Sequence, residues 1–76
     1  MDAKRISTII VTDLTNDILK LQENLEFSIN KDSDIDEKII EIKRILAKIV
    51  NTEAMLVKFT QLINSDSNNN NNNNNN

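Results

Sequence analysis

Three aspartates at alternate positions are the first candidate for chemistry in this 76-residue chain. Asp32, Asp34 and Asp36 have the spacing with which an EF-hand loop begins to bind calcium. That loop also requires glycine at its sixth position and glutamate at its twelfth, where this chain has Glu37 and Lys43. The sequence therefore predicts no calcium site, and we interpret these acids as caps of the helix that follows.

A short basic stretch is the second candidate. Lys43, Arg44 and Lys48 lie within six residues of one another, and such a cluster can bind an acidic partner or a phosphoinositide headgroup. An acid, Glu41, lies beside them, and mixed charges of this kind are typical of a solvent-facing helix surface. We therefore expect these basic residues to lie on a solvent-facing helix surface rather than to form a binding site.

Residue types that most catalytic and metal sites use are absent. The chain has no His, Cys or Gly. It therefore has no side chain that titrates near neutrality unperturbed, no thiolate nucleophile, no usual zinc ligand and no glycine-rich phosphate loop. The carboxylates and lysines that remain need a deep pocket to shift their pKa, which a short chain can hardly build. We expect no enzyme, no catalytic residue, no metal and no cofactor.

Charge and hydropathy exclude further classes. The net charge is −3, which argues against nucleic acid as the main partner. The longest apolar run, residues 54–57, is far too short to span a bilayer, and the apolar residues after Lys4 and Arg5 are too few for a signal peptide. We expect a cytoplasmic protein without direct membrane insertion.

The second half of the body carries the clearer helical pattern. Apolar residues recur every seven positions, with partial support three residues later and on both flanks, which is typical of a coiled-coil helix with a wide apolar stripe. This repeat consists of Ile35, Ile42, Ile49, Leu56 and Ile63. Ser33 or Asp34 can cap the start, with an acid three residues later as in a capping box.

The first half shows a weaker pattern. Val11, Leu14, Ile18, Leu21 and Leu25 alternate spacings of three and four, which again predicts a helix. The β-branched segment 6–12 lowers helix propensity, so a strand there, or a helix that starts only at about residue 12, is the alternative. Because no Gly or Pro interrupts the chain, we favour helix throughout.

These patterns predict an all-α fold with two long amphipathic helices in a helical hairpin or coiled coil. We expect a helix at about 3–29, a turn at about 30–33 and a helix at about 34–64, with one bent rod as the alternative to the closed hairpin. The Asn-rich tail, residues 65–76, is predicted to be disordered. Its Asn run is typical of eukaryotic sequences. The expected interface residues are Val11, Leu14, Ile18, Leu21, Leu25, Ile35, Ile42, Ile45, Ile49, Leu56, Phe59 and Ile63.

Two further positions carry open alternatives. Phe27 falls off the apolar seam of the first helix, so it either contacts a partner or is simply exposed. Thr52 interrupts the seam of the second helix, where it either fixes the register of a coiled coil or faces a thin part of the interface.

The segment 35–56 resembles the cappuccino subunit family of the biogenesis of lysosome-related organelles complex. The shared features are a Lys and a Glu three apart, two isoleucines, and a Glu-Ala pair before two apolar residues: Lys38, Glu41, Ile45, Ile49 and residues 53–56. The resemblance covers about 25 of the 76 residues. It implies a coiled-coil subunit of a hetero-oligomeric rod that acts in endosomal and lysosomal cargo sorting, recruited to the cytosolic face of those organelles.

We therefore expect a non-catalytic coiled-coil subunit of a hetero-oligomeric complex, with other coiled-coil subunits as partners and hetero-oligomer favoured over homo-oligomer. A body this small is marginal alone, and without Cys or a metal site a partner chain is the stabiliser that remains. The alternatives are a self-associating helical-bundle adaptor and a small subunit of a kinetochore, actin-regulatory or tethering complex. A membrane-surface amphipathic peptide is the remotest class, because it needs a basic polar face.

Overall fold

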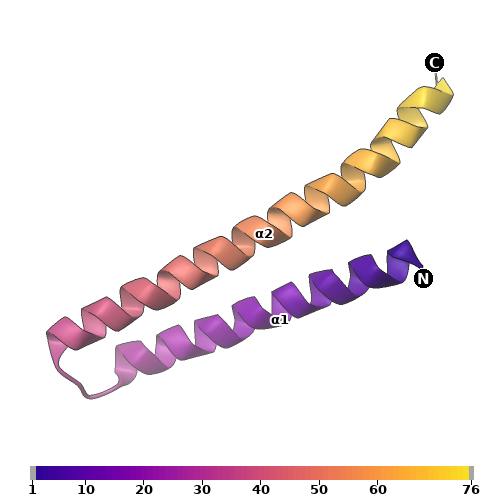
Figure 1. Ribbon diagram of the computed structural model, residues 1–76. Coiled ribbons are helices and arrows are strands. Elements are labelled where there is room, and N and C mark those ends of the chain that lie inside the picture. The colour runs from indigo at the N-terminus through magenta and orange to yellow at the C-terminus, as the bar shows by residue number, and fades with distance from the viewer. Residues whose placement is uncertain (1, 76) are drawn as a thin grey trace.

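The computed structural model describes the backbone of residues 2–75 and the side chains of residues 2–65. It consists of α1, Ala3–Asn30, and α2, Ile35–Asn75. The two helices run antiparallel and lie side by side, joined by a short turn at one end (Figure 1). The predicted all-α hairpin is therefore confirmed, and neither a strand over 6–12 nor a single continuous rod is present in residues 2–75.

The N-terminal cap explains why α1 begins at Ala3 despite the β-branched residues that follow. The Asp2 carboxylate accepts a hydrogen bond from the Lys4 backbone N–H at 3.0 Å, and the Asp2 carbonyl accepts one from the Ile6 N–H at 3.1 Å. The first bond uses a donor that a helix start leaves free, and the second is the first intrahelical bond, which the N-cap carbonyl accepts. Ser7 and Thr8 turn their hydroxyls back onto the carbonyls of Ala3 and Lys4, and α1 begins at Ala3 rather than at about residue 12.

Asp34 begins α2 in the manner that the capping pattern predicts. Its carboxylate accepts from the Glu37 backbone N–H at 3.3 Å, and its carbonyl accepts from the Lys38 N–H at 2.9 Å. Asp36 and Glu37 in the first turn suit the positive end of the helix dipole. Of the two caps considered, Asp34 is the one used, and Asp36 follows it in the first turn of α2.

The C-terminal part of α2 continues as helix to Asn75, past the predicted end at about residue 64. In the predicted disordered tail, residues 65–76, all side chains except that of Ser65 lie outside the described residues. Its disorder stays a prediction. The interaction surfaces below are built entirely from residues 2–65.

The core is a single thin seam between the two helices. Ile45 and Ile49 of α2 are the only apolar side chains of the described part that fall to 8% exposure. Both lie near the middle of α2, where α1 packs alongside over its whole length (Figure 1). A two-helix arrangement can cover each helix from one side only, so the remainder of each surface stays open.

Candidate protein-protein interface

The predicted interface residues line the seam inside the hairpin, with one exception. The α1 members are all half-buried, and the α2 members are half-buried or buried, apart from Ile35. The seven-residue repeat is thus accounted for by packing of α1 against α2. Four of these seam residues also line the grooves described below: Leu14, Leu21, Ile45 and Phe59.

Ile35 does not join the seam. It is 70% exposed, although it has the same heptad position as Ile42 and Ile49. Ile35 is the first residue of α2, and the chain opposite it is the turn rather than the body of α1. A heptad position therefore predicts the direction of a side chain but not whether another helix reaches it.

Two polar contacts close the seam at the turn end. The Ser28 hydroxyl, 3% exposed, donates a hydrogen bond of 2.6 Å to Glu41 Oε1. Lys38 Nζ donates one of 3.1 Å to the carbonyl of Ile29, one of the last carbonyls of α1 that lack a partner within the helix. Since α1 has no basic residue in its own last turn, Lys38 supplies from α2 the positive charge that a helix C-terminus favours.

Sequence reasoning missed this pair of contacts, although a signal for it exists. Ser28 continues the spacing of Leu14 and Leu21, and Lys38 precedes Ile45 by seven residues, so both are polar residues at seam positions. Each apolar row therefore ends in a polar residue next to the turn. In an antiparallel hairpin these two row ends lie near each other at the turn, which could have indicated polar contacts there. We name the bonds from Ser28 to Glu41 and from Lys38 to Ile29 the clamp.

The clamp changes the acidity of Glu41. The hydrogen bond from Ser28 is the main reason that the pKa of Glu41 lies below its ordinary value, and the charges of Lys31 and Arg44 lower it further. Partial loss of hydration raises the pKa of Glu41; this effect is smaller than that of Ser28 but larger than that of either charge. Glu41 is therefore held as a carboxylate, the form that accepts the bond from Ser28.

We predict a pH dependence of stability from this group. Because the folded-state pKa is lowered, the stabilising contribution is complete above the ordinary value of 4.5 and is lost as pH falls through the lower folded pKa. Urea unfolding from pH 7 to pH 3 should show a smaller acid-induced loss in Glu41→Gln than in the parent chain, since the amide still accepts from Ser28. Parallel pH profiles for both chains would contradict the assignment.

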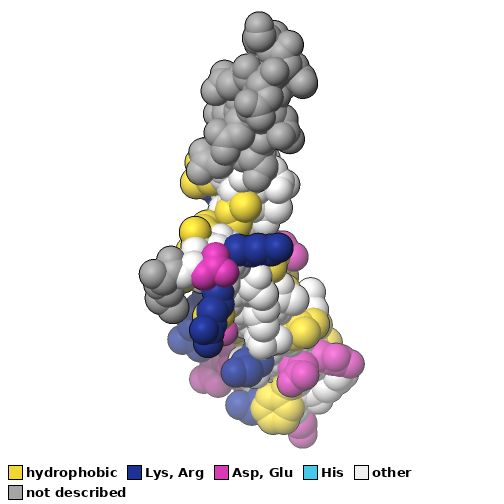
Figure 2. All heavy atoms as spheres, turned by 90° about the vertical axis from the view of Figure 1, so that its right-hand side faces the viewer, with side chains coloured by type: hydrophobic (Ala, Val, Ile, Leu, Met, Phe, Trp, Pro, Cys, Tyr) yellow, Lys and Arg dark blue, Asp and Glu magenta, His cyan; other side chains and the backbone are white. Residues whose placement is uncertain are grey.

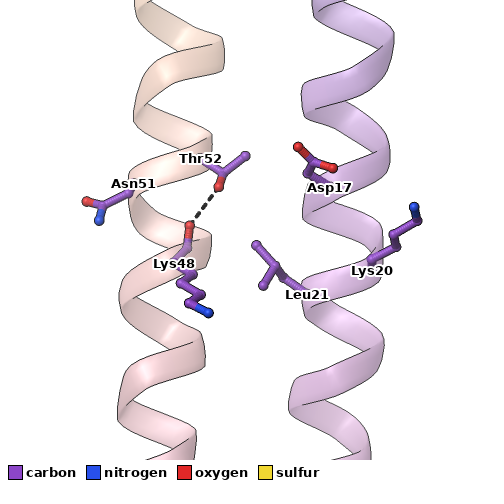
Figure 3. A pocket seen from close by; sticks show the side chains of 6 residues that line it. All are labelled: Asp17, Lys20, Leu21, Lys48, Asn51 and Thr52. Atoms are coloured by element: carbon purple, nitrogen blue, oxygen red, sulfur yellow. Dashed lines mark hydrogen bonds between the residues drawn. The ribbon is translucent and has the colours of Figure 1, made fainter.

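Thr52 is buried in the middle of the seam, at 9% exposure. Its hydroxyl donates to the carbonyl of Lys48 at 2.8 Å within α2 (Figure 3), so it forms no bond to α1. Figure 3 shows Leu21 pointing from α1 into the space between the helices. Thr52 therefore occupies a seam position without a polar partner across the seam. This favours the second alternative, in which Thr52 faces a thin part of the interface and does not fix the register.

The three residues of the basic stretch do not all lie on the same surface of the hairpin. Arg44 and Lys48 line a groove of about 290 Å³ on one side of the hairpin, together with Asn24, Phe27 and Glu41, whereas Lys43 does not line it. The neighbouring groove, of about 340 Å³, adds Asp17 and Lys20 to Lys48 (Figure 3). Both grooves combine positive and negative groups, so neither concentrates basic charge as an anion site would.

Large apolar side chains remain on the surface in quantity. Figure 2, which views the open end of the hairpin, shows hydrophobic side chains at the surface among charged ones. The exposed large apolar residues are Ile6, Ile9, Leu19, Phe27, Ile29, Ile35, Ile39, Ile40, Leu46, Val50, Met55, Val57 and Leu62. Phe27, 68% exposed, lies off the seam as its position predicts.

One apolar groove lies toward the open end of the hairpin. It has a volume of about 350 Å³ and is lined by Ile10 and Leu14 of α1 and by Met55, Lys58, Phe59 and Leu62 of α2. We name it the end groove. Lys58 contributes its aliphatic stem to such a surface while its charge reaches water.

Residues 2–65 contain no cluster of three or more acidic side chains placed to hold a metal ion. In the searched part of the chain, neither helix has the length and apolarity that crossing a bilayer requires. Comparison of the chain with protein-family models, with curated proteins and with solved structures finds no match.

Proposed function

We propose that the chain is a non-catalytic helical subunit that assembles with coiled-coil chains of other proteins in a hetero-oligomeric complex. The observation that carries the proposal is the balance of burial. Among residues 2–65, two apolar residues are buried below 9% exposure, whereas thirteen large apolar residues remain exposed. Exposed apolar surface of this extent is typical of a protein interface.

Energetics supports a partner. A small body with one thin seam has little hydrophobic stabilisation to set against the conformational entropy of about 60 ordered residues. Full burial of one exposed Ile, Leu or Met side chain by a partner contributes about 1.5–3 kcal/mol to the stability of the complex. A helix is the natural occupant, because a groove between two antiparallel helices accepts a third helix with its apolar face inward.

The end groove is the surface that we assign to the partner helix. It combines half-buried residues of both helices, Ile10 and Phe59 among them, with the exposed Met55 and Leu62. Flexible Met and aromatic side chains are frequent at interface centres. An incoming apolar side chain would cover both helices at once and so join them at the end where no turn holds them.

The finer placement comes from the resemblance of segment 35–56 to the cappuccino family. On that basis the complex acts in biogenesis of lysosome-related organelles and endosomal trafficking, at the cytosolic face of those membranes. Kinetochore, actin-regulatory and tethering complexes are the alternatives, since they also contain small helical subunits.

Affinity capture of the full chain from the cells that express it, followed by reconstitution with the captured chains, tests this function. Leu62→Asp places a charge in the end groove and should abolish the reconstituted complex. Gln61→Asp, on the adjacent exposed position, should leave it intact. The proposal fails if the chain is captured only with copies of itself, or if both variants assemble equally well.

A self-associating helical bundle is the second candidate function. One specific observation favours it, namely an apolar row along α2 that lies outside both the seam and the end groove. That row supports an inference of its own.

A further inference from the structure

A second apolar row runs along α2 on the side away from the end groove. Its members are Ile39, Leu46, Val50 and Val57, which are 45%, 44%, 61% and 55% exposed. We name it the outer stripe. None of the four lines any of the grooves described above. At about 100° per residue the outer stripe is rotated by about 100° from the seam of α2, so α1 does not cover it.

The spacing of the outer stripe is that of a coiled-coil seam. Successive members lie seven, four and seven residues apart, as the two core positions of a heptad do. The same register assigns core positions to Lys43 and Glu53, both of which are exposed. The outer stripe therefore has one positive and one negative position among its apolar ones.

This pattern is symmetric about residue 48. In an antiparallel coiled coil, each layer pairs the two different core positions of the heptad. Pairing residues equidistant from residue 48 sets Ile39 against Val57 of a second copy and Leu46 against Val50 of the second copy. The same pairing sets Lys43 against Glu53 of the second copy, so both charges are matched in a single register.

Other alignments lack this match. A parallel, in-register pair sets Lys43 against Lys43 and Glu53 against Glu53, and like charges in a coiled-coil core oppose association. Shifting the antiparallel pair by one heptad sets Leu46 against Lys43 in one direction and Val50 against Glu53 in the other. Within residues 39–57, only the register centred on residue 48 pairs apolar with apolar and acid with base in every layer.

Small residues let the helices approach at the centre. Ala47 and Ala54 are exposed and directly flank the outer stripe, where a large side chain would hold the second helix away. A twofold dimer is also the commonest symmetric assembly, in which the same surface serves both copies.

We propose that α2 pairs with α2 of a second copy, antiparallel, through Ile39, Leu46, Val50 and Val57, with Lys43 of each copy bonded to Glu53 of the other. The charged layers cost desolvation but set the register and direction. This inference goes beyond the proposed function, since it requires no second kind of chain and leaves the end groove of each copy open.

Sedimentation velocity of the full chain, over about 1–200 µM to bracket a micromolar dimer, tests the pairing by charge exchange. Lys43→Glu alone and Glu53→Lys alone should each weaken the dimer about tenfold or more, because each creates like-charge layers. An equimolar mixture of the two variants should restore it, since every Lys then faces a Glu. Lys48→Glu, on the groove side of α2, should change nothing.

Leu46→Asp is a second test, in which the dimer should be lost while helical circular dichroism persists, because Leu46 is outside the hairpin seam. A chain that stays monomeric at every concentration would overturn the proposal, as would a dimer that survives Leu46→Asp or a mixture that is not restored. These outcomes are separable from failure of the proposed function. Leu62→Asp should abolish binding of the hetero-oligomeric partner but leave the self-association intact. Leu46→Asp should abolish the self-association but leave binding of that partner intact.

Discussion

Ile49→Asp is expected to unfold most of the hairpin at 25 °C, whereas Ile40→Asp leaves it folded. Ile49 is 8% exposed in the centre of the seam, and Ile40 is 68% exposed on the outer side of the same helix. Burial of one such apolar side chain contributes about 1.5–3 kcal/mol, and a charge without a partner in its place adds several kcal/mol more. That sum exceeds the roughly 3–5 kcal/mol that one core of this size supplies.

The comparison is matched because the two variants share the same chemical change and the same helix, nine residues apart. Far-ultraviolet circular dichroism with urea titration measures it, and Ile49→Asp should show the spectrum of a largely disordered chain. Equal helicity and equal urea midpoints for the two variants would show that the seam does not hold the helices together.

Much of the fold could be predicted because helical periodicity and capping are local properties. The 3-4 spacing from Val11 to Leu25 and the seven-residue repeat from Ile42 to Ile63 identify the seam directly. Asp34 could be predicted as a cap because its side chain needs only the backbone three residues ahead. The turn followed from the one polar cluster in the body, residues 30–34.

The interaction surfaces could be predicted less well, and the reason is physical. Periodicity identifies apolar rows on a helix, but α2 has several neighbouring rows, and only the position of α1 decides which of them is covered. Ile35 shows the limit, since it has a seam position but only the turn, and no part of α1, lies opposite it. The Ser28–Glu41 bond shows the converse, because a polar residue in an apolar row becomes meaningful only when its partner across the turn is known.

The proposed partner helices would cover apolar surface that the hairpin leaves exposed. The chain has no Cys and so no disulfide, and two helices offer each other one face only. The end groove and the outer stripe then present two separate apolar surfaces on opposite sides of the seam. The two proposals together place a second copy on one side of the seam and a different chain on the other.

Replacing the whole turn by alanine, with Lys31→Ala, Asp32→Ala, Ser33→Ala and Asp34→Ala together, is expected to convert the hairpin into a continuous helix. Asp and Ser each disfavour a helix interior by roughly 0.5 kcal/mol relative to Ala, and removal of the Asp34 cap withdraws about 1 kcal/mol from the start of α2. Both changes favour a helix that runs through residues 31–34.

A continuous helix cannot fold back on itself, so its seam must be covered by a second chain. The antiparallel register makes this possible, because α1 of one copy can pack on α2 of the other with the same residue pairs, as in a domain swap. A helix over 3–75 is roughly 110 Å long, with a radius of gyration of roughly 30 Å, against 17.9 Å for the hairpin.

Small-angle X-ray scattering with sedimentation distinguishes the two forms. Asp32→Gly with Ser33→Gly is the control, since each Gly disfavours helix by about 1 kcal/mol and should preserve the hairpin. If the four-alanine chain keeps the dimensions of this control at every concentration, the turn is held by the contacts around it, the Ser28–Glu41 bond and the bond from Lys38 to Ile29. The seam and the clamp, rather than the composition of residues 31–34, would then determine where the chain reverses.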